Sequence, residues 1–196
     1  MSYWTDLRTP TELELFVGKY DLSQYTVFCE RTQPARALEL VTSYHGLVNA
    51  RLEEAGGILI KPIGDAGLFA FPAEATDTAV ETVEDILEQG DAWLTRESYP
   101  GRARFVAHVG PVAIGRIKSQ EQEWLDIIGK TVNIVVSMRG YRFTMTPAVF
   151  RHMSAPLRKR FKKHTPPTSY IGINDPRPRT YWRGYEGVSF RENDPA

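Results

Sequence analysis

Two aspartates of this 196-residue chain, Asp21 and Asp65, each stand where a predicted strand ends. Asp65 lies in Lys61–Phe71 (KPIGDAGLFAF), whose apolar residues and turn-forming glycines predict a β-hairpin with the carboxylate at its tip. The apolar run Leu13–Tyr20 predicts the strand that ends at Asp21. Two carboxylates with open coordination positions suit Mg²⁺ or Mn²⁺, completed by water and substrate phosphates. Two ordinary turn aspartates are the alternative.

The elements that must position these carboxylates follow a β-α-β-β-α-β order. After the first strand we expect a helix over 34–55, the hairpin, and a second helix from about Thr76 that ends before Gly101. Later segments predict strands at 105–109, 112–117 and 124–128, a short helix within 130–140, a weak strand at 143–146 and a helix at 148–153. This order predicts an α+β, ferredoxin-like sheet with extra strands and with helices covering one face. Its first and third strands lie close together, so Asp21 and Asp65 are expected to meet at one edge of the sheet.

Apolar spacing predicts which face of each long helix is buried. The first helix carries apolar residues at intervals of three and four: Leu38, Val41, Tyr44, Leu47, Val48, Leu52 and Ala55. The second carries Ala79, Val80, Val83, Ile86, Leu87 and Leu94. We expect both sets to face the sheet.

Composition narrows the class of protein. The 24 basic and 24 acidic residues cancel, which disfavours a nucleic-acid or anionic-membrane partner. A lone cysteine, Cys29, excludes an intrachain disulfide, and the absence of a long apolar run predicts a cytoplasmic protein without a membrane span. The sequence has no Cys/His cluster of the kind that binds structural zinc. It also has no Walker loop and no GxGxxG motif, so any nucleotide must be held in another way.

The predicted domain organisation is one domain with additions at both ends. Residues 1–14 are expected to form a lead-in, 15–153 the central domain, and 154–196 a basic, Pro/Arg/aromatic-rich extension packed on it. The basic run 158–164 is expected to be a solvated helix face, with a phosphate or nucleic-acid contact as the alternative. Strand candidates in the extension are 170–173 and 180–185.

Four motifs then resemble class III adenylate/guanylate cyclase catalytic domains. DLSQYT at 21–26 is similar to the family's Asp-x-x-Gly-Phe-Thr, and KPIGDA at 61–66 to its Lys-x-Ile-Gly-Asp-Ala. AHVGPV at 107–112 resembles Ile-His-Thr-Gly-Pro-Val, and LDIIGKTVN at 125–133 resembles Tyr-Asp-x-x-Gly-Asp-Thr-Val-Asn. The motifs occur in the family's order and with its approximate spacing.

The resemblance implies a nucleotidyl cyclase that needs Mg²⁺ or Mn²⁺. It implies that Asp21, Asp65 and the Leu22 carbonyl bind two divalent ions, which lower the pKa of the ribose 3′-hydroxyl and neutralise the triphosphate. Attack of that oxygen on the α-phosphorus then expels pyrophosphate. Backbone donors near Tyr25 and Thr26, at the start of a helix, would hold phosphate oxygens.

The resemblance also implies a head-to-tail homodimer, in which Asn133 of a second subunit positions the ribose. Family members carry an arginine one helical turn beyond this asparagine, and here that position is Ser137. Arg139, two residues further on, is the candidate substitute. At about 100° per residue it points away from the Asn133 face, so it can serve only if the helix ends or bulges early. Loss of such a cation costs a factor of about 10² to 10³ in rate.

Base recognition is implied for Lys61 and Asp126, which occupy the positions that read the purine edge in adenylate cyclases. Each has a structural alternative, as an edge-strand charge and a turn residue respectively. A bare catalytic domain also resembles the pyrimidine cyclases of anti-phage signalling, which make cyclic UMP or cyclic CMP for a downstream receptor. We narrowly favour a pyrimidine substrate, with Tyr25 or Tyr44 narrowing the pocket. The alternatives are ATP and a catalytically silent nucleotide-binding dimer. His108 is expected to serve packing rather than catalysis.

Overall fold

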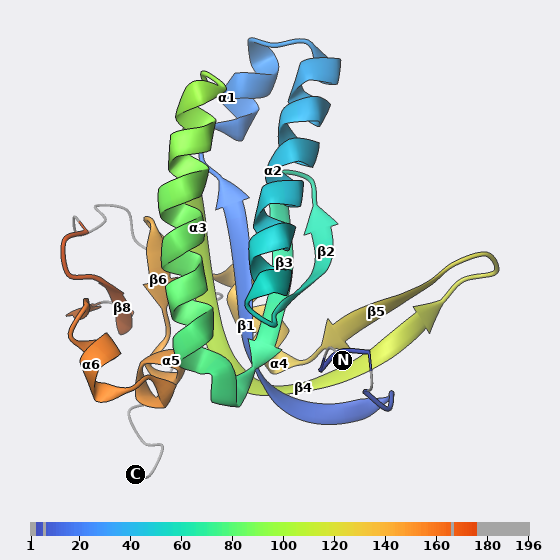
Figure 1. Cartoon of the computed structure of the whole chain (residues 1–196), viewed down its shortest axis with the longest axis vertical. Coiled ribbons are helices and arrows are strands. Elements are labelled where there is room, and N and C mark those ends of the chain that lie inside the picture. Colours follow the sequence, from blue (N-terminus) through green and yellow to red (C-terminus); the bar gives the residue numbers. More distant parts are fainter. Residues whose placement is uncertain (1–2, 6, 166, 176–196) are drawn as a thin grey trace.

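The computed structural model describes residues 3–5, 7–165 and 167–175, and one mixed sheet forms its centre (Figure 1). The strand order is β2-β3-β1-β4-β6-β8-β7, and β5 pairs with β4. Among the strand pairs of the described residues, only β4–β6 is parallel. The strands are β1 (Thr11–Leu22), β2 (Ile58–Ile63), β3 (Ala66–Pro72), β4 (Ala103–Lys118), β5 (Glu123–Ile128), β6 (Phe143–Met145), β7 (Phe161–His164) and β8 (Ser169–Gly172).

Six α-helices and a 3₁₀ turn at Ala73–Ala75 complete the described part of the chain. The helices are α1 (Tyr25–Glu30), α2 (Pro34–Glu54), α3 (Thr76–Arg96), α4 (Lys130–Ser137), α5 (Pro147–His152) and α6 (Ala155–Arg158). The two long helices, α2 and α3, lie side by side across one face of the sheet (Figure 1). Within the described residues, no helix is both long and apolar enough to cross a membrane.

The ferredoxin-like prediction is confirmed. The four strands of the β-α-β-β-α-β unit lie in the order β2-β3-β1-β4, so the first and third strands of the unit are neighbours. The predicted hairpin is also confirmed, because β2 and β3 flank a two-residue turn of Gly64 and Asp65. Gly64 has φ 62°, a backbone conformation that favours glycine.

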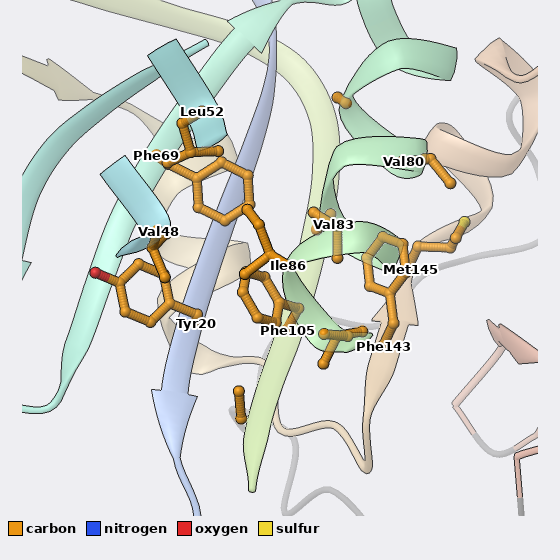
Figure 2. Packing of buried hydrophobic residues seen from close by; sticks show 14 of the residues in the cluster. Tyr20, Val48, Leu52, Phe69, Val80, Val83, Ile86, Phe105, Phe143 and Met145 are labelled. Atoms are coloured by element: carbon orange, nitrogen blue, oxygen red, sulfur yellow. The ribbon is translucent and has the colours of Figure 1, made fainter. Parts of the chain in front are cut away.

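The main core lies between the sheet and the two long helices (Figure 2). Alternate β1 residues supply Phe16 and Tyr20, which pack with Phe69 from β3 and Phe105 from β4. The expected α3 face is confirmed throughout, since all six predicted residues are buried. In α2 one prediction is wrong: Leu38 is 68% exposed, and Ala37 and Leu40 are buried instead. At about 100° per residue, Ala37 lies on the buried face, whereas Leu38 lies at its edge.

A second core lies on the opposite face, so the expectation that helices cover only one face is wrong. There Ile134, Val135 and Met138, in and just after α4, pack on Leu15 and Val17 of β1. Successive strand residues point to opposite faces, so β1 serves both cores. The short helix α4 therefore approaches the sheet from the side that α2 and α3 leave open.

The two strands predicted around Gly110 and Pro111 are one continuous strand, β4. Both residues stay paired with β1, and they lie between the part of β4 that pairs with β6 and the part that pairs with β5. A proline is tolerated in a strand that has an unpaired side. The far part of β4 and β5 project from the body as an arm (Figure 1).

The basic run 158–164 is not the helix face that its charges predicted. Helix α6 ends at Arg158, and Phe161–His164 form β7, whose Phe161 is buried against Phe143. Alternation along a strand buries Phe161 while the lysines remain partly exposed. The strand predicted at 170–173 is confirmed as β8 (Ser169–Gly172), whereas the candidate at 180–185 lies outside the described residues.

Candidate functional site

The ends of the two neighbouring strands bring Asp21 and Asp65 together. Asp21 is the penultimate residue of β1, and Asp65 stands just before β3, where Tyr20 pairs with Gly67. The Leu22 backbone N–H donates to Asp65 Oδ2 across 3.2 Å. Two carboxylates and one backbone carbonyl, that of Leu22, therefore lie at one end of the central strands.

Arg104 belongs to this cluster, although the sequence reasoning did not single it out. It lies opposite Asp21 in the β1–β4 register, and its Nε donates to Asp21 Oδ1 across 2.6 Å. The Arg104 side chain remains 37% exposed, so the other donors of its guanidinium can reach a ligand. The signal that could have found it is the position of Arg104 near the start of the strand that pairs with β1.

Burial raises the pKa of Asp65 above its usual value, and the Asp21 carboxylate nearby raises it further. The Leu22 N–H and the Arg104 guanidinium act in the opposite direction, because both favour the charged form. Desolvation has the larger effect. A carboxylate in this setting gains from a cation nearby.

Helix α1 begins directly beside the two carboxylates. Gln24 precedes Tyr25 and has φ 67°, so it adopts a left-handed conformation at the position where the family motif has glycine. Thr26, the next residue, is exposed. Burial raises the pKa of Tyr25 to about 12, and the negative charge of Asp65 makes a smaller contribution in the same direction. The predicted triphosphate residues thus lie near the carboxylates.

Lys61 and Asp126 form an ion pair, with Nζ 2.6 Å from Oδ2. The Asp126 side chain is 8% exposed, and its other oxygen, Oδ1, accepts from the Ile127 N–H at 2.8 Å. The pair joins β2, which leads into the Asp65 turn, to β5 of the arm. In contrast, Tyr44 is fully buried in the main core, so it cannot narrow a base pocket as predicted.

Asn133 belongs to α4, the helix that packs on the face of the sheet opposite α2 and α3. It is exposed on α4, and within the described residues its side chain has no hydrogen-bond partner. Ser137, at the position of the family arginine, donates to the Ile134 carbonyl of its own helix at 2.9 Å. Within the described residues, no hydrogen bond joins Asn133 to Asp21 or Asp65 of its own chain.

Helix α4 ends early. Such an early end is required if Arg139 is to replace the family arginine. The helix stops at Ser137, and Met138 has extended dihedral angles, φ −62° and ψ 141°. Arg139 Nη1 then folds back to the Val136 and Met138 carbonyls, each 3.3 Å away. Its guanidinium accordingly lies against the C-terminal carbonyls of α4.

A buried lysine, Lys19, donates to the same two carbonyls as Arg139. Lys19 is 7% exposed, and its Nζ donates to the Val136 carbonyl at 3.1 Å and the Met138 carbonyl at 3.3 Å. Burial lowers the pKa of Lys19, whereas the nearby Asp21 carboxylate raises it. A cation at a helix C-terminus is favourable, so Lys19 fixes the end of α4 on β1.

The residues at the carboxylate end fit a divalent cation. Mg²⁺ is typically bound by one or two carboxylates, while waters and substrate phosphates complete an octahedral shell. Asp21 and Asp65 supply the carboxylates, and the Leu22 carbonyl adds a hard oxygen. Within the described residues, no group of three or more His, Cys, Asp or Glu side chains forms an all-protein cage. The donor set therefore suits an ion that shares its shell with a substrate.

Comparison with solved structures identifies the fold. A bacterial light-regulated adenylyl cyclase superposes with a TM-score of 0.73 at 19% identity, covering 86% of this chain and 54% of that one. The adenylyl cyclase CyaB from P. aeruginosa gives 0.72 at 14% identity, over 87% and 98%. The guanylate cyclase domain of RhGC from Catenaria anguillulae, solved with GTP, gives 0.68 at 21% identity, over 79% and 87%. The chain has the fold of class III nucleotide cyclase catalytic domains.

Sequence comparison also finds a cyclase, over a smaller part of the chain. No model of a protein family matches the chain. An adenylate cyclase from Anabaena cylindrica is 25% identical over 154 residues, which cover 69% of this chain. The matched region spans 30% of that protein and 54% of the light-regulated cyclase, so both relatives extend well beyond it.

Proposed function

We propose that this chain is a metal-dependent nucleotidyl cyclase, which converts a nucleoside triphosphate into a 3′,5′-cyclic monophosphate and pyrophosphate. The observation that carries the proposal is the position of Asp21, Leu22 and Asp65 at one end of neighbouring strands in a cyclase fold. The catalytic domain is taken as 15–153, with 1–14 as a lead-in and 154–196 as an extension on the same domain.

Each residue of the cluster has a role in this proposal. Asp21, Asp65 and the Leu22 carbonyl would hold two Mg²⁺ or Mn²⁺ ions, which activate the ribose 3′-hydroxyl and neutralise phosphate charge. Backbone N–H groups at Tyr25 and Thr26 would hold triphosphate oxygens. Arg104, beside Asp21, is an added candidate for the same task, since a guanidinium binds phosphate through several donors.

The active unit in this proposal is a homodimer. Asn133 is exposed on α4 and, within the described residues, makes no hydrogen bond to Asp21 or Asp65 of its own chain, which supports a role in the site of a second subunit. Exposed apolar side chains on α4, β2 and β5 accompany it: Val136, Ile63, Trp124 and Ile128. Strand β5 contacts both β2 and α4, and exposed apolar residues on neighbouring elements are typical of a protein interface.

Arg139 is proposed to replace the family arginine. Because α4 ends at Ser137, Arg139 is not held at the helical position that points away from Asn133, and its guanidinium lies against the C-terminal carbonyls of the helix. Being exposed, it can turn from the helix carbonyls to a phosphate at a dimer interface. It would stabilise the charge that develops on the α-phosphate, as a cation does in such transition states.

For the base we keep a pyrimidine triphosphate, UTP or CTP, as the proposed substrate, with its product acting on a receptor in anti-phage signalling. Each Asp126 oxygen already accepts one hydrogen bond inside the protein, and the more exposed partner is the Lys61 ammonium. A donor at this point suits the carbonyl acceptors of uracil or cytosine. ATP remains the alternative substrate, because the same pair can separate and present a donor and an acceptor to adenine.

A second candidate function is a catalytically silent nucleotide-binding dimer with a regulatory role. One observation favours it: the residue at the arginine position, Ser137, bonds only within its own helix in the described structure. This alternative predicts nucleotide binding without turnover.

The test compares Asp65→Asn with a matched control, Asp85→Asn, on the exposed face of α3. Both variants remove one carboxylate, but only Asp65 lies in the cluster. Cyclic nucleotide formation with Mn²⁺ should fall at least about 10²-fold in Asp65→Asn and stay unchanged in the control. Equal activity of the two variants would remove the proposed metal site.

A further inference from the structure

His45 bridges the residues that immediately precede the two carboxylates. Its Nδ1 lies 2.6 Å from the Tyr20 hydroxyl, and its Nε2 lies 2.9 Å from the Gly64 carbonyl. Tyr20 directly precedes Asp21, and Gly64 directly precedes Asp65. The imidazole comes from α2, an element that contributes no other residue to the cluster.

The direction of these hydrogen bonds follows from their partners. A carbonyl oxygen can only accept, so Nε2 of His45 carries the hydrogen and donates to Gly64. In the neutral imidazole Nδ1 is then an acceptor, and the Tyr20 hydroxyl donates to it. The two hydrogen bonds therefore run from the Tyr20 hydroxyl through the His45 imidazole to the Gly64 carbonyl, and each of these polar atoms has a partner.

At one end of these hydrogen bonds, Tyr20 is held by the core. Tyr20 is fully buried, and its ring packs with Tyr44 and Phe105 at centroid distances of 6.0 and 5.6 Å. It also lies over Gly67, where an added Cβ would come within 2.4 Å of the ring. The hydroxyl of Tyr20 is thus fixed by the core and by a glycine that leaves room for the ring.

At the other end of these hydrogen bonds lies the exposed turn of Gly64 and Asp65. Gly64 is exposed and Asp65 half-buried, and the Leu22 N–H to Asp65 bond joins the turn to β1 from the opposite side. His45 itself sits on a helix anchored by the buried Tyr44 and Val48. The imidazole therefore connects the Asp65 turn to α2 and, through Tyr20, to the main core.

We propose that His45 is a positioning residue that fixes the Asp65 turn relative to Asp21, and thereby sets the affinity of the cluster for a divalent cation. The metal part of this inference rests on the proposed function, whereas the positioning part does not. Groups that orient metal-binding side chains typically contribute 10- to 100-fold in metal affinity.

The test uses His45→Ala, which removes both bonds, and His45→Gln, whose side-chain amide can keep the donor to Gly64. His152→Ala is the matched control, because that histidine is exposed on α5 and Nδ1 bonds a carbonyl of its own helix. Tyr20→Phe removes only the hydroxyl. Mn²⁺ affinity is measured on the full chain without nucleotide, from the electron paramagnetic resonance signal of free Mn²⁺, with urea unfolding alongside.

We expect His45→Ala to weaken Mn²⁺ binding about tenfold or more, and His45→Gln and the His152 control to stay within about threefold of the wild type. A direct readout without metal is hydrogen exchange at the Leu22 amide, which should quicken at least about tenfold in His45→Ala. A role confined to folding would lower stability in both His45 variants and give no rescue by glutamine.

The positioning role is overturned if Leu22 exchange in His45→Ala matches the wild type, or if His45→Gln behaves like His45→Ala. Should His45→Ala not fold, Tyr20→Phe decides the same question: Leu22 exchange faster than in the wild type supports the positioning role, and unchanged exchange overturns it. If the wild type binds no Mn²⁺ and forms no cyclic product, the proposed function fails, and Leu22 exchange alone decides the role of His45.

Discussion

The Lys61 ammonium and the Asp126 carboxylate lie 2.6 Å apart, so β2 of the Asp65 hairpin and β5 of the projecting arm are joined by one ion pair. Asp126 is nearly buried while Lys61 is 38% exposed. Loss of Lys61 would therefore leave a buried carboxylate without its partner, and loss of Asp126 would leave an exposed ammonium.

The first prediction concerns this pair. Lys61→Met should raise the KM for the triphosphate about tenfold or more with a smaller change in kcat, because base contacts bind the substrate equally before and during reaction. It should also lower the free energy of unfolding by about 1–2 kcal/mol, because Asp126 loses its partner. Lys118→Met is the matched control, since Lys118 pairs with Glu123 on the exposed arm. Steady-state kinetics and urea unfolding measure both effects, and equal results for the two variants would contradict the role of Lys61.

The second prediction concerns Arg139. Arg139→Ala should lower kcat by about 10² or more with little change in KM, because the cation is needed for charge that develops in the transition state. Adding Ser137→Arg to that variant should restore part of the lost activity. Retention of full kcat in Arg139→Ala would assign the task to another cation.

The third prediction concerns subunit assembly. Asp65→Asn and Asn133→Ala should each be inactive alone, but an equal mixture should regain about a quarter of wild-type activity. This fraction follows because half of the dimers are mixed and each mixed dimer has one intact site of two. Activity is measured after the two variants are unfolded and refolded together. A mixture that stays inactive contradicts a site shared between subunits.

The fourth prediction concerns pH. Burial, together with the nearby Lys130 and Arg151, lowers the pKa of His108 from 6.5 to about 4. As pH falls below 6.5 the unfolded chain takes up the proton first, so the stability that His108 contributes is complete above this range and is lost toward pH 4. At pH 5 the loss should be about 2 kcal/mol.

The check is urea unfolding at pH 5 and pH 7.5 in the wild type and in His108→Asn. The asparagine amide can keep the 2.8 Å contact with Thr146 but does not titrate. The variant should lose less stability than the wild type between the two pH values. The same loss in both would show that other groups govern the pH dependence.

Much of the fold follows from local sequence patterns. Turn-forming glycines around Asp65 and the regular apolar spacing of α3 predict the hairpin and the second helix, because both patterns act through neighbouring residues. The position of α4 on the other face was missed, since its short apolar run does not specify which side of a sheet it covers. The continuity of β4 was missed because pairing with β1 outweighs the local turn preference of Gly110 and Pro111.

The candidate site shows the same limit. Asp21 and Asp65 stand out because their motifs are local, whereas Arg104 and His45 reach the cluster through strand register and helix packing. Neither property appears in the residues that flank them. Arg139 depended on where α4 ends, and that end is set by Met138 leaving helical geometry, which a 100° rotation per residue does not predict.

The most direct test of the central proposal is incubation of the purified chain with Mn²⁺ and each of ATP, GTP, UTP and CTP separately, with cyclic products identified by mass spectrometry. The proposal predicts a 3′,5′-cyclic monophosphate and pyrophosphate, formed from UTP or CTP and lost in Asp65→Asn. A product from ATP alone would contradict the pyrimidine preference and leave the cyclase standing. Nucleotide binding without a cyclic product from any of the four would contradict the cyclase itself.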